Sequence, residues 1–342
     1  MSKKIKVSYV LGILNAERTL EECLNGILSQ EFSKKDYEII IVDGGSKDKT
    51  LEIVRNYSKK YPNIHLFHNP YKLSEGKGMA KDQGIKKAKG EFIVLLDHDN
   101  IITDKNWLKK MLLPLRLDKK IMATQSFLYY QEKDSNFLKY INALGVEDSF
   151  AIPYSIVAQA TLHPEKFILV KNKYYLPSPK KKLVLFGGAN GAVFRKNVFE
   201  IIGGYTRDVN ISASMTKKNL QIAMVKGARL YHKSGSNFFN FLKKKAIYFY
   251  RFITFGYKEE SFRWIPHSFS GKIRFTLMII SNLTLIFPLI FSIKQIIKTG
   301  EFFWIFHPFY LFSMTLLYGF MTLFKIKNFF KYKKQNSIFL LL

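Results

Sequence analysis

Short apolar runs alternate with longer amphipathic stretches along the first third of the chain. Each short run is apolar almost throughout, which is typical of a strand buried on both faces of a parallel sheet. The predicted strands are Lys6–Leu11, Glu38–Val42, Ile64–Phe67 and Glu91–Leu96. The polar and apolar positions that follow them have helical spacing and predict helices at Thr19–Gln30, Asp48–Lys60, Gly78–Ala88 and Asn106–Leu117. This alternation predicts a doubly wound α/β domain with a mostly parallel sheet.

The pattern loosens between about residues 120 and 235. A further strand is predicted at Lys182–Phe186, followed by a glycine-rich turn that ends at Gly191. The segment Phe238–Tyr257 is dense in aromatic residues and lysines, a composition that suits a helix lying at a membrane interface. We therefore expect interfacial helices over residues 236–270.

Two uncharged segments near the C-terminus predict a pair of helices that span the membrane or enter it as a re-entrant hairpin. They run from Phe275 to Ile293 and from Phe302 to Phe324, and each is long enough to cross a hydrocarbon core of roughly 30 Å. Basic residues flank the pair on both outer sides, which by the positive-inside rule predicts a hairpin with both ends in the cytoplasm. The predicted boundaries are 271–326 for the hairpin and 327–342 for a basic cytoplasmic tail. Two buried helices of a soluble domain, or helices lying flat in the interface, are the alternatives.

The chain carries a strong positive charge. Its 54 Lys and Arg against 26 Asp and Glu give a formal net charge of +28, which attracts polyanions such as phosphorylated substrates or anionic membranes. Nucleic acid is not an expected partner, because the basic residues are spread over the whole chain and no recognition module is present. Cys23 is the only cysteine, so the sequence excludes a disulfide framework and a cysteine-based zinc site.

The segment Asp97-His98-Asp99-Asn100 follows the fourth predicted strand. Carboxylates at positions i and i+2 at the carboxyl end of a parallel strand face the edge where open α/β sheets bind ligands. They repel each other unless a cation lies between them, and Mg²⁺ or Mn²⁺ prefers oxygen ligands and often bridges to phosphates. A polar turn that caps the next helix is the alternative interpretation.

Three polar segments precede this pair, and all lie at strand ends or at the start of a helix. Alone, each is typical of an ordinary turn. They are Leu11–Glu17, Ile41–Thr50 and Glu75–Ala80. In the order found, the four segments resemble those of the family 2 glycosyltransferases, which have the GT-A fold, a Rossmann-like nucleotide-sugar-binding domain. The resemblance covers about residues 5–235. It implies a GT-A domain over 1–235, with a donor half at about 1–125 and an acceptor half at about 126–235.

The resemblance also implies a UDP- or GDP-sugar donor, a divalent metal (Mg²⁺ or Mn²⁺), and roles for individual residues. Asp43 would recognise the base, and Gly12 and Ile13 would line the nucleoside pocket with backbone groups. Asp97 would lie near the ribose and the metal, and Asp99 would bind the metal at the diphosphate. The other residues assigned to the nucleotide sugar are Asn15, Gly45, Lys77 and His98. His232 falls where family members often carry a late histidine near the metal, although a structural histidine is the alternative.

The acceptor side departs from the family pattern. Family members normally carry a Glu-Asp pair after the segment corresponding to Gly203-Gly204-Tyr205, and its aspartate is the general base. No such pair follows here, so Asp208 is only a candidate base. Arg195 lies in a segment that resembles the family's acceptor side. Arg251 could contact the diphosphate or an acceptor phosphate, and a solvated or lipid-facing charge is the alternative.

Two explanations fit the missing base. An anionic acceptor such as polyisoprenyl phosphate carries its own nucleophilic oxygen and needs little base catalysis. Alternatively, Asp208 serves a sugar hydroxyl on a lipid-linked or surface glycan. The first explanation agrees with the predicted membrane hairpin and the positive charge. We therefore expect a membrane-bound, metal-dependent, inverting glycosyltransferase with a lipid-linked acceptor at the cytoplasmic face. A catalytically silent membrane scaffold that keeps the fold is the alternative from another functional class.

Overall fold

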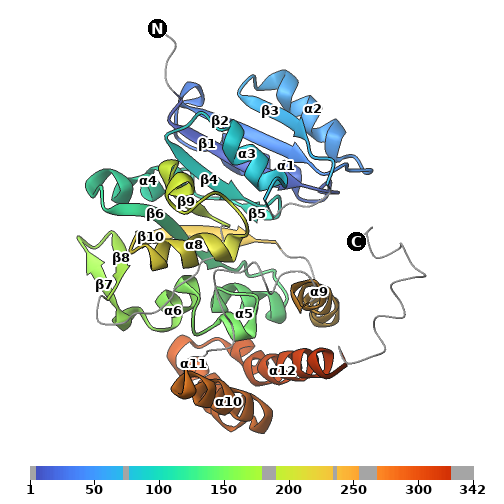
Figure 1. Ribbon diagram of the computed structural model, residues 1–342, viewed down its shortest axis with the longest axis vertical. Coiled ribbons are helices and arrows are strands. Elements are labelled where there is room, and N and C mark those ends of the chain that lie inside the picture. The colour runs from blue at the N-terminus through green and yellow to red at the C-terminus, as the bar shows by residue number, and fades with distance from the viewer. Residues whose placement is uncertain (1–4, 72–76, 179–189, 234–236, 254–267, 325–342) are drawn as a thin grey trace. The chain divides into compact units, whose positions relative to one another are not determined.

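The computed structural model describes residues 5–71, 77–178, 190–233, 237–253 and 268–324 (Figure 1). Within these ranges the chain divides into two compact units. The first comprises Met1–Lys133 and Ile141–Ser234, and the second comprises Asp134–Tyr140 and Gly235–Leu342. The predicted strand at Lys182–Phe186 lies outside the described residues, as does the basic tail.

The first unit contains one mixed sheet in the order β3-β2-β1-β4-β9-β6-β10-β8-β7, and β5 pairs with β10. Neighbours within β3-β2-β1-β4 are parallel, as are β6 and β10, whereas β9 runs antiparallel between β4 and β6. The mostly parallel α/β fold expected from the sequence is therefore confirmed. The strands are β1 Val7–Ile13, β2 Tyr37–Asp43, β3 Ile64–His68, β4 Phe92–Leu96, β5 Asn100–Ile101, β6 Ile121–Tyr129, β7 Phe167–Val170, β8 Tyr174–Pro177, β9 Ala192–Arg195 and β10 Gln221–His232.

Helices cover both faces of this sheet. Alternate residues of the fully buried β1 enter different cores: Tyr9 and Leu11 belong to one core with residues of α1, α2 and α4, while Val10 belongs to the other with residues of α3, α6, α7 and α8. This division explains why the strands are apolar throughout rather than alternating. The helices of the first unit are α1 Leu20–Leu28, α2 Thr50–Lys60, α3 Ala80–Lys87, α4 Trp107–Leu117, α6 Ile156–Leu162, α7 Asn197–Ile201 and α8 Asp208–Lys217, with short 3₁₀ turns at Lys34–Asp36, Ser149–Ala151 and Pro164–Lys166.

The second unit is helical, and its core is aromatic. The unit boundary crosses α5 (Asn136–Leu144), which continues into the first unit at Ile141. Phe137 of this helix packs edge-on against Phe241 and Phe306, and the hydroxyl of Tyr140 lies 2.8 Å from Nδ1 of the buried His307. The remaining helices are α9 Phe238–Arg251, α10 Phe269–Thr284, α11 Ile286–Thr299, the 3₁₀ segment η5 Phe302–Ile305 and α12 Phe306–Phe324.

The apolar segment Phe275–Ile293 is helical but not one continuous helix. The structure divides this stretch into α10 and α11, which are bent by 74°. Leu285 at the break has a left-handed φ of 62°. Pro288 lacks the N–H that would bond the carbonyl of Thr284 in an unbroken helix, and its ring would collide with that carbonyl. The other predicted segment, Phe302–Leu323, is long and apolar enough to cross a membrane, and half of it is buried within the protein.

Candidate functional site

The carboxyl ends of β1, β2 and β4 meet at one edge of the sheet. The register pairs Ile13 with Asp43 and Leu11 with Leu96, so Gly12 is level with the start of the Asp97-His98-Asp99 segment. The predicted donor residues on these three strands therefore share one edge, where open α/β sheets bind ligands.

The loops after β1 and β2 are held together by reciprocal hydrogen bonds. Asn15, which has a left-handed φ of 50°, accepts the N–H of Lys47 through its side chain (2.9 Å), and its own N–H donates to Oγ of Ser46 (2.9 Å). The N–H of Glu17 donates to Asp48 (3.2 Å). These bonds fix the two loops as one rigid rim at the donor edge.

Asp43 is nearly fully buried at the end of β2 and organises the turn that follows. Its carboxylate accepts the N–H of Gly45 (2.8 Å) and both the N–H and the hydroxyl of Ser46. Gly45 has a φ of 91°, a conformation that disfavours any residue with a Cβ. The structure thus assigns Asp43 a structural role in the turn, and its role toward a base remains an expectation from the family resemblance.

Asp97 contacts a lysine that the sequence patterns did not single out. Oδ1 of Asp97 lies 2.8 Å from Nζ of Lys81, which is fully buried on α3. The same ammonium lies 2.8 Å from Oδ2 of Asp208, the first residue of α8. Lys81 therefore joins the predicted donor aspartate to the predicted base, although Lys81 and Asp208 are 127 residues apart in the sequence.

Both carboxylate oxygens of Asp208 have donors. The hydroxyl of Tyr205 donates to Oδ1 (2.7 Å), and the Lys81 ammonium donates to Oδ2. Asp208 is 7% exposed. These contacts compete directly with any acceptor hydroxyl that would need the aspartate as a proton acceptor.

Asp99 turns toward a different set of partners. Oδ2 lies 3.2 Å from Nε2 of His232, and Oδ1 accepts the side-chain N–H of Asn100 (3.1 Å). The pairing of β5 with β10 places Asn100 opposite His232. On the other side of the ring, Nδ1 of His232 lies 3.6 Å from Oε1 of Glu147. The imidazole therefore lies between two carboxylates.

The remaining predicted site residues are more dispersed. Nδ1 of His98 lies 2.7 Å from the hydroxyl of Thr19, and Lys77 is exposed in the turn before α3. Arg195 pairs with Phe92 at the opposite end of β4, and its guanidinium donates to the carbonyl oxygens of Leu115 and Ile121. The structure therefore does not bring Arg195 to the donor edge. Arg251 is the last residue of α9 and belongs to the second unit, and its side chain lies outside the described part of the chain.

The chemistry of this edge fits a divalent cation. Asp97 and Asp99 supply hard oxygen atoms, and the buried Oδ1 of Asn100 has no hydrogen-bond partner, as expected of an atom that awaits a ligand or water. No set of three His, Cys, Asp or Glu side chains in the described part of the chain is close enough to share a metal ion. In the structure Asp97 contacts Lys81, whereas Asp99 contacts His232.

Cys23 is chemically silent. Its thiol is buried on α1 with Sγ 3.8 Å from the carbonyl oxygen of Asp97. Burial raises the pKa of the thiol strongly, and the nearby carboxylates of Asp99 and Asp97 raise it further. Since only the thiolate is a good nucleophile or metal ligand, Cys23 contributes packing rather than chemistry.

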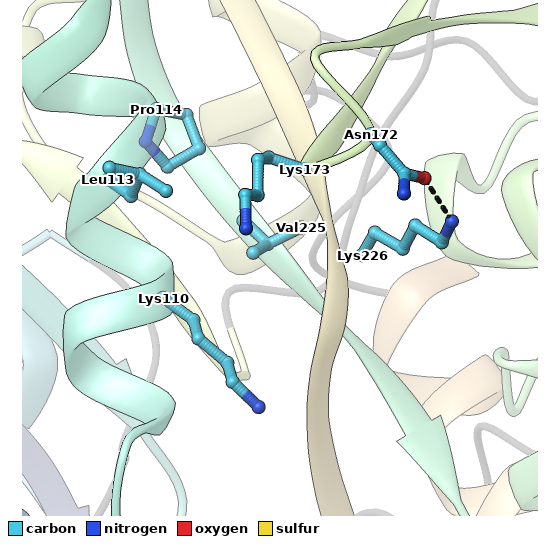
Figure 2. A pocket seen from close by; sticks show the side chains of 7 residues that line it. All are labelled: Lys110, Leu113, Pro114, Asn172, Lys173, Val225 and Lys226. Atoms are coloured by element: carbon cyan, nitrogen blue, oxygen red, sulfur yellow. Dashed lines mark hydrogen bonds between the residues drawn. The ribbon is translucent and has the colours of Figure 1, made fainter.

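A separate cavity of about 300 Å³ lies away from these residues (Figure 2). It is lined by α4, the turn between β7 and β8, and the middle of β10, and its charged residues are Lys110, Lys173 and Lys226. Lys110 donates to Asp104 and to the carbonyl of Gly227. Lys226 donates to Asn172, the bond drawn in Figure 2. This cavity shares no residue with the donor edge.

Lys81, Glu147 and Tyr205 are the residues near the site that the sequence patterns missed. A signal for Lys81 was available, since it follows Gly76-Lys77-Gly78 by one helical turn. Glu147 belongs to a Glu-Asp pair, Glu147-Asp148, but this pair lies about sixty residues upstream of the position where the family pattern predicts one. Only the fold places it beside His232.

Comparison with known proteins supports the family assignment. A dolichyl-phosphate beta-glucosyltransferase of Trichomonas vaginalis is 42% identical over 101 residues, covering 28% of this chain and 31% of that protein. A poly(ribitol-phosphate) beta-glucosyltransferase of Bacillus spizizenii is 40% identical over 98 residues, covering 29% of this chain and 15% of that protein. The chain thus spans less than a third of the length of these relatives.

The fold has counterparts among solved structures. A mannosyltransferase of Pyrobaculum calidifontis, in complex with GDP-Man and Mn²⁺, superimposes with a TM-score of 0.53 at 14% identity, covering 93% of this chain and 88% of that one. The sequence profile of the family described as Glycosyl transferase family 2 matches residues 8–202, more than half of the chain. The chain belongs to glycosyl transferase family 2.

Proposed function

We propose that this chain is a metal-dependent, inverting glycosyltransferase that moves a sugar from a UDP- or GDP-sugar to a lipid-linked acceptor, which we take to be a polyisoprenyl phosphate. The acceptor proposal rests on the hydrogen bonds that Asp208 accepts. Its two oxygens are held by Tyr205 and Lys81. A phosphate oxygen already bears a negative charge and needs no such base, whereas a sugar hydroxyl does.

The donor proposal rests on the rim after β1 and β2 and on Asp97. The rigid loops present backbone groups of Gly12, Ile13 and Gly45 at the carboxyl edge of the sheet, where a nucleoside can lie. The mannosyltransferase of Pyrobaculum calidifontis, whose fold is similar, is in complex with GDP-Man and Mn²⁺. Asn15, Lys77 and His98 are placed on the surrounding loops and remain proposed contacts.

A divalent metal would be held by Asp99, with Asp97 and His232 as the other proposed ligands. When bound, such a metal neutralises the charge that develops on the departing nucleoside diphosphate. Lys81 keeps Asp97 in position through the 2.8 Å contact. Asn100 steadies Asp99 through its side-chain hydrogen bond. The acceptor oxygen must then be aligned with the anomeric carbon.

The second unit supports a membrane location. Its helices expose many large apolar side chains, among them Leu277, Phe287, Ile297 and Phe320, and such surface is more than a soluble monomer normally exposes. A lipid-linked acceptor lies in the membrane, and membrane lipids are therefore the expected partner of these helices. Nucleotide sugars are the proposed donors, so we place the first unit on the cytoplasmic face.

The proposal is tested with the full chain in detergent or proteoliposomes. UDP- and GDP-sugars are offered with Mn²⁺ and polyprenyl phosphate, and the lipid fraction is examined for a glycosyl phospholipid. A nucleotide panel read by melting temperature identifies the donor, since only a bound ligand stabilises the fold. Transfer to a glycan hydroxyl but not to polyprenyl phosphate would instead favour a glycan-extending enzyme. No transfer and no nucleotide-induced stabilisation would favour a silent scaffold.

A further inference from the structure

The bent pair α10–α11, residues 269–299, has a distinctive distribution of apolar and charged residues. Exposed apolar side chains follow both helices and include Phe287 beside the break, which is 68% exposed. The charged residues lie only toward the two open ends, with Lys272 and Arg274 at the start of α10 and Lys294 and Lys298 toward the end of α11. We call this pair the apolar wedge (Figure 1).

Two buried polar side chains of the wedge, Asn282 and Ser292, bond to other elements of the second unit. Asn282 donates to the hydroxyl of Thr315 on α12 (3.0 Å), and the Ser292 hydroxyl donates to the carbonyl of Trp304 (2.6 Å). The wedge also carries large exposed apolar side chains, among them Leu277, Phe287 and Ile297. Since the ends are basic and the middle is apolar, the surface matches a lipid monolayer with anionic headgroups above acyl chains.

The dimensions decide how this surface can meet a bilayer. With the 74° bend, the uncharged stretch between Arg274 and Lys294 measures only about 22 Å from end to end, well short of the roughly 30 Å hydrocarbon core. The same geometry places the apex about 8 Å from the line joining the charged ends. Interfacial helices bury their apolar face by roughly 5–10 Å.

We propose that the apolar wedge inserts into one leaflet and does not cross the membrane. Both of its ends then lie on the same face as the headgroups that their lysines and arginine contact. This inference rests on the proposed membrane location but not on the donor, the acceptor or the transfer reaction.

The test uses single cysteines in a full chain that carries Cys23→Ala, which removes the only native cysteine. Ser270→Cys and Lys298→Cys mark the two ends of the wedge, and Glu52→Cys on α2 marks the face of the first unit. A membrane-impermeant maleimide is applied to spheroplasts and to inverted membrane vesicles. We expect all three cysteines to react at least ten-fold more in inverted vesicles.

Reaction of the Ser270→Cys and Lys298→Cys variants from opposite faces would overturn the wedge, because it would show a crossing. Failure of either to react after detergent opening of the vesicles would also count against it, since that end would lie within hydrocarbon or protein. A nitroxide on Phe287→Cys gives an independent measure. A depth within roughly 10 Å of the headgroups supports the wedge, and a position at the bilayer centre contradicts it.

Discussion

The donor edge and the acceptor side of the first unit are built in different ways. The donor edge uses the ends of β1, β2 and β4, strands that are parallel and adjacent in the sheet. The acceptor side depends on contacts between distant segments, such as Lys81 with Asp208 and Asp99 with His232, which are 127 and 133 residues apart. Parallel topology alone brings strand ends together, whereas side-chain pairs of this kind need the whole fold.

Asp99 follows β4 in the donor half and contacts His232 of the acceptor half. We therefore expect its loss to have the largest effect on transfer. We expect Asp99→Asn to lower the transfer rate by about 10³-fold, equal to about 4 kcal/mol, because the proposed metal loses an anionic ligand. Removal of divalent metal from the wild-type protein with EDTA should reproduce this loss, and Mn²⁺ should restore it. Asp118→Asn, at the end of α4, is the matched control and should leave the rate unchanged. An active Asp99→Asn protein would contradict the metal role.

Lys81 tests whether the two halves depend on each other for stability. Lys81→Met leaves the buried carboxylate of Asp208 and the neighbouring Asp97 without their shared cation. Removing one partner of a buried ion pair costs about 3–5 kcal/mol, which should lower the melting temperature by roughly 10 °C. Lys81→Arg retains the charge and should lower the melting temperature less than Lys81→Met does. A melting temperature of Lys81→Met equal to that of the wild type would show that the bridge does not link the halves.

Asp208 separates the two acceptor classes. If the acceptor is polyprenyl phosphate, Asp208→Asn should slow transfer by less than about ten-fold, through altered placement of Lys81 and Tyr205. A general base would instead cost about 10²–10⁴-fold. The rate is measured under saturating donor with the lipid acceptor, and Tyr205→Phe provides a matched loss of one hydrogen bond to the same carboxylate. A decrease in the transfer rate of about 10²–10⁴-fold would instead identify Asp208 as the general base.

Asp48 probes the rigid rim of the donor edge and should have the smallest effect. Burial alone would raise the pKa of Asp48, but hydrogen bonds from Thr50 and Glu17 outweigh it, so the pKa is lowered. A lowered folded-state pKa means that Asp48 stabilises the protein above its ordinary pKa near 3.8 and loses this contribution as the pH falls below it. Asp48→Asn should therefore lower the free energy of unfolding near pH 7 by less than about 1 kcal/mol, because solvent screens this partly exposed carboxylate.

The difference between Asp48→Asn and the wild type should shrink when melting curves are recorded at progressively lower pH. Glu52→Gln, on the exposed face of the same helix, is the control. A difference that stays constant down to the acid limit would show that hydrogen bonding to the ionised carboxylate is not what holds the rim.

Much of the first unit follows from local pattern. The four predicted strands and four predicted helices of residues 5–125 all occur, with ends shifted by a few residues. The side chain of Asp48 accepts the N–H of Thr50 at the start of α2, and that of Asp104 accepts the N–H of Asn106 just before α4. The break at Leu285 also has a local signal in the sequence, because Pro288 disfavours an unbroken helix. The predicted segment was based on hydrophobicity and did not use this signal.

The sequence by itself determined the α/β alternation, the acidic and glycine-rich segments at the strand ends, the family and the apolar C-terminal stretch. These features depend on periodicity and on residues near one another in the chain, which short-range sterics and burial fix. The tertiary structure alone decided that Lys81 joins Asp97 to Asp208, that Glu147 faces His232, and that Arg195 lies at the far end of β4. Such pairings arise only when the packed sheet brings together side chains from distant parts of the chain, because no local rule specifies which charged groups become neighbours.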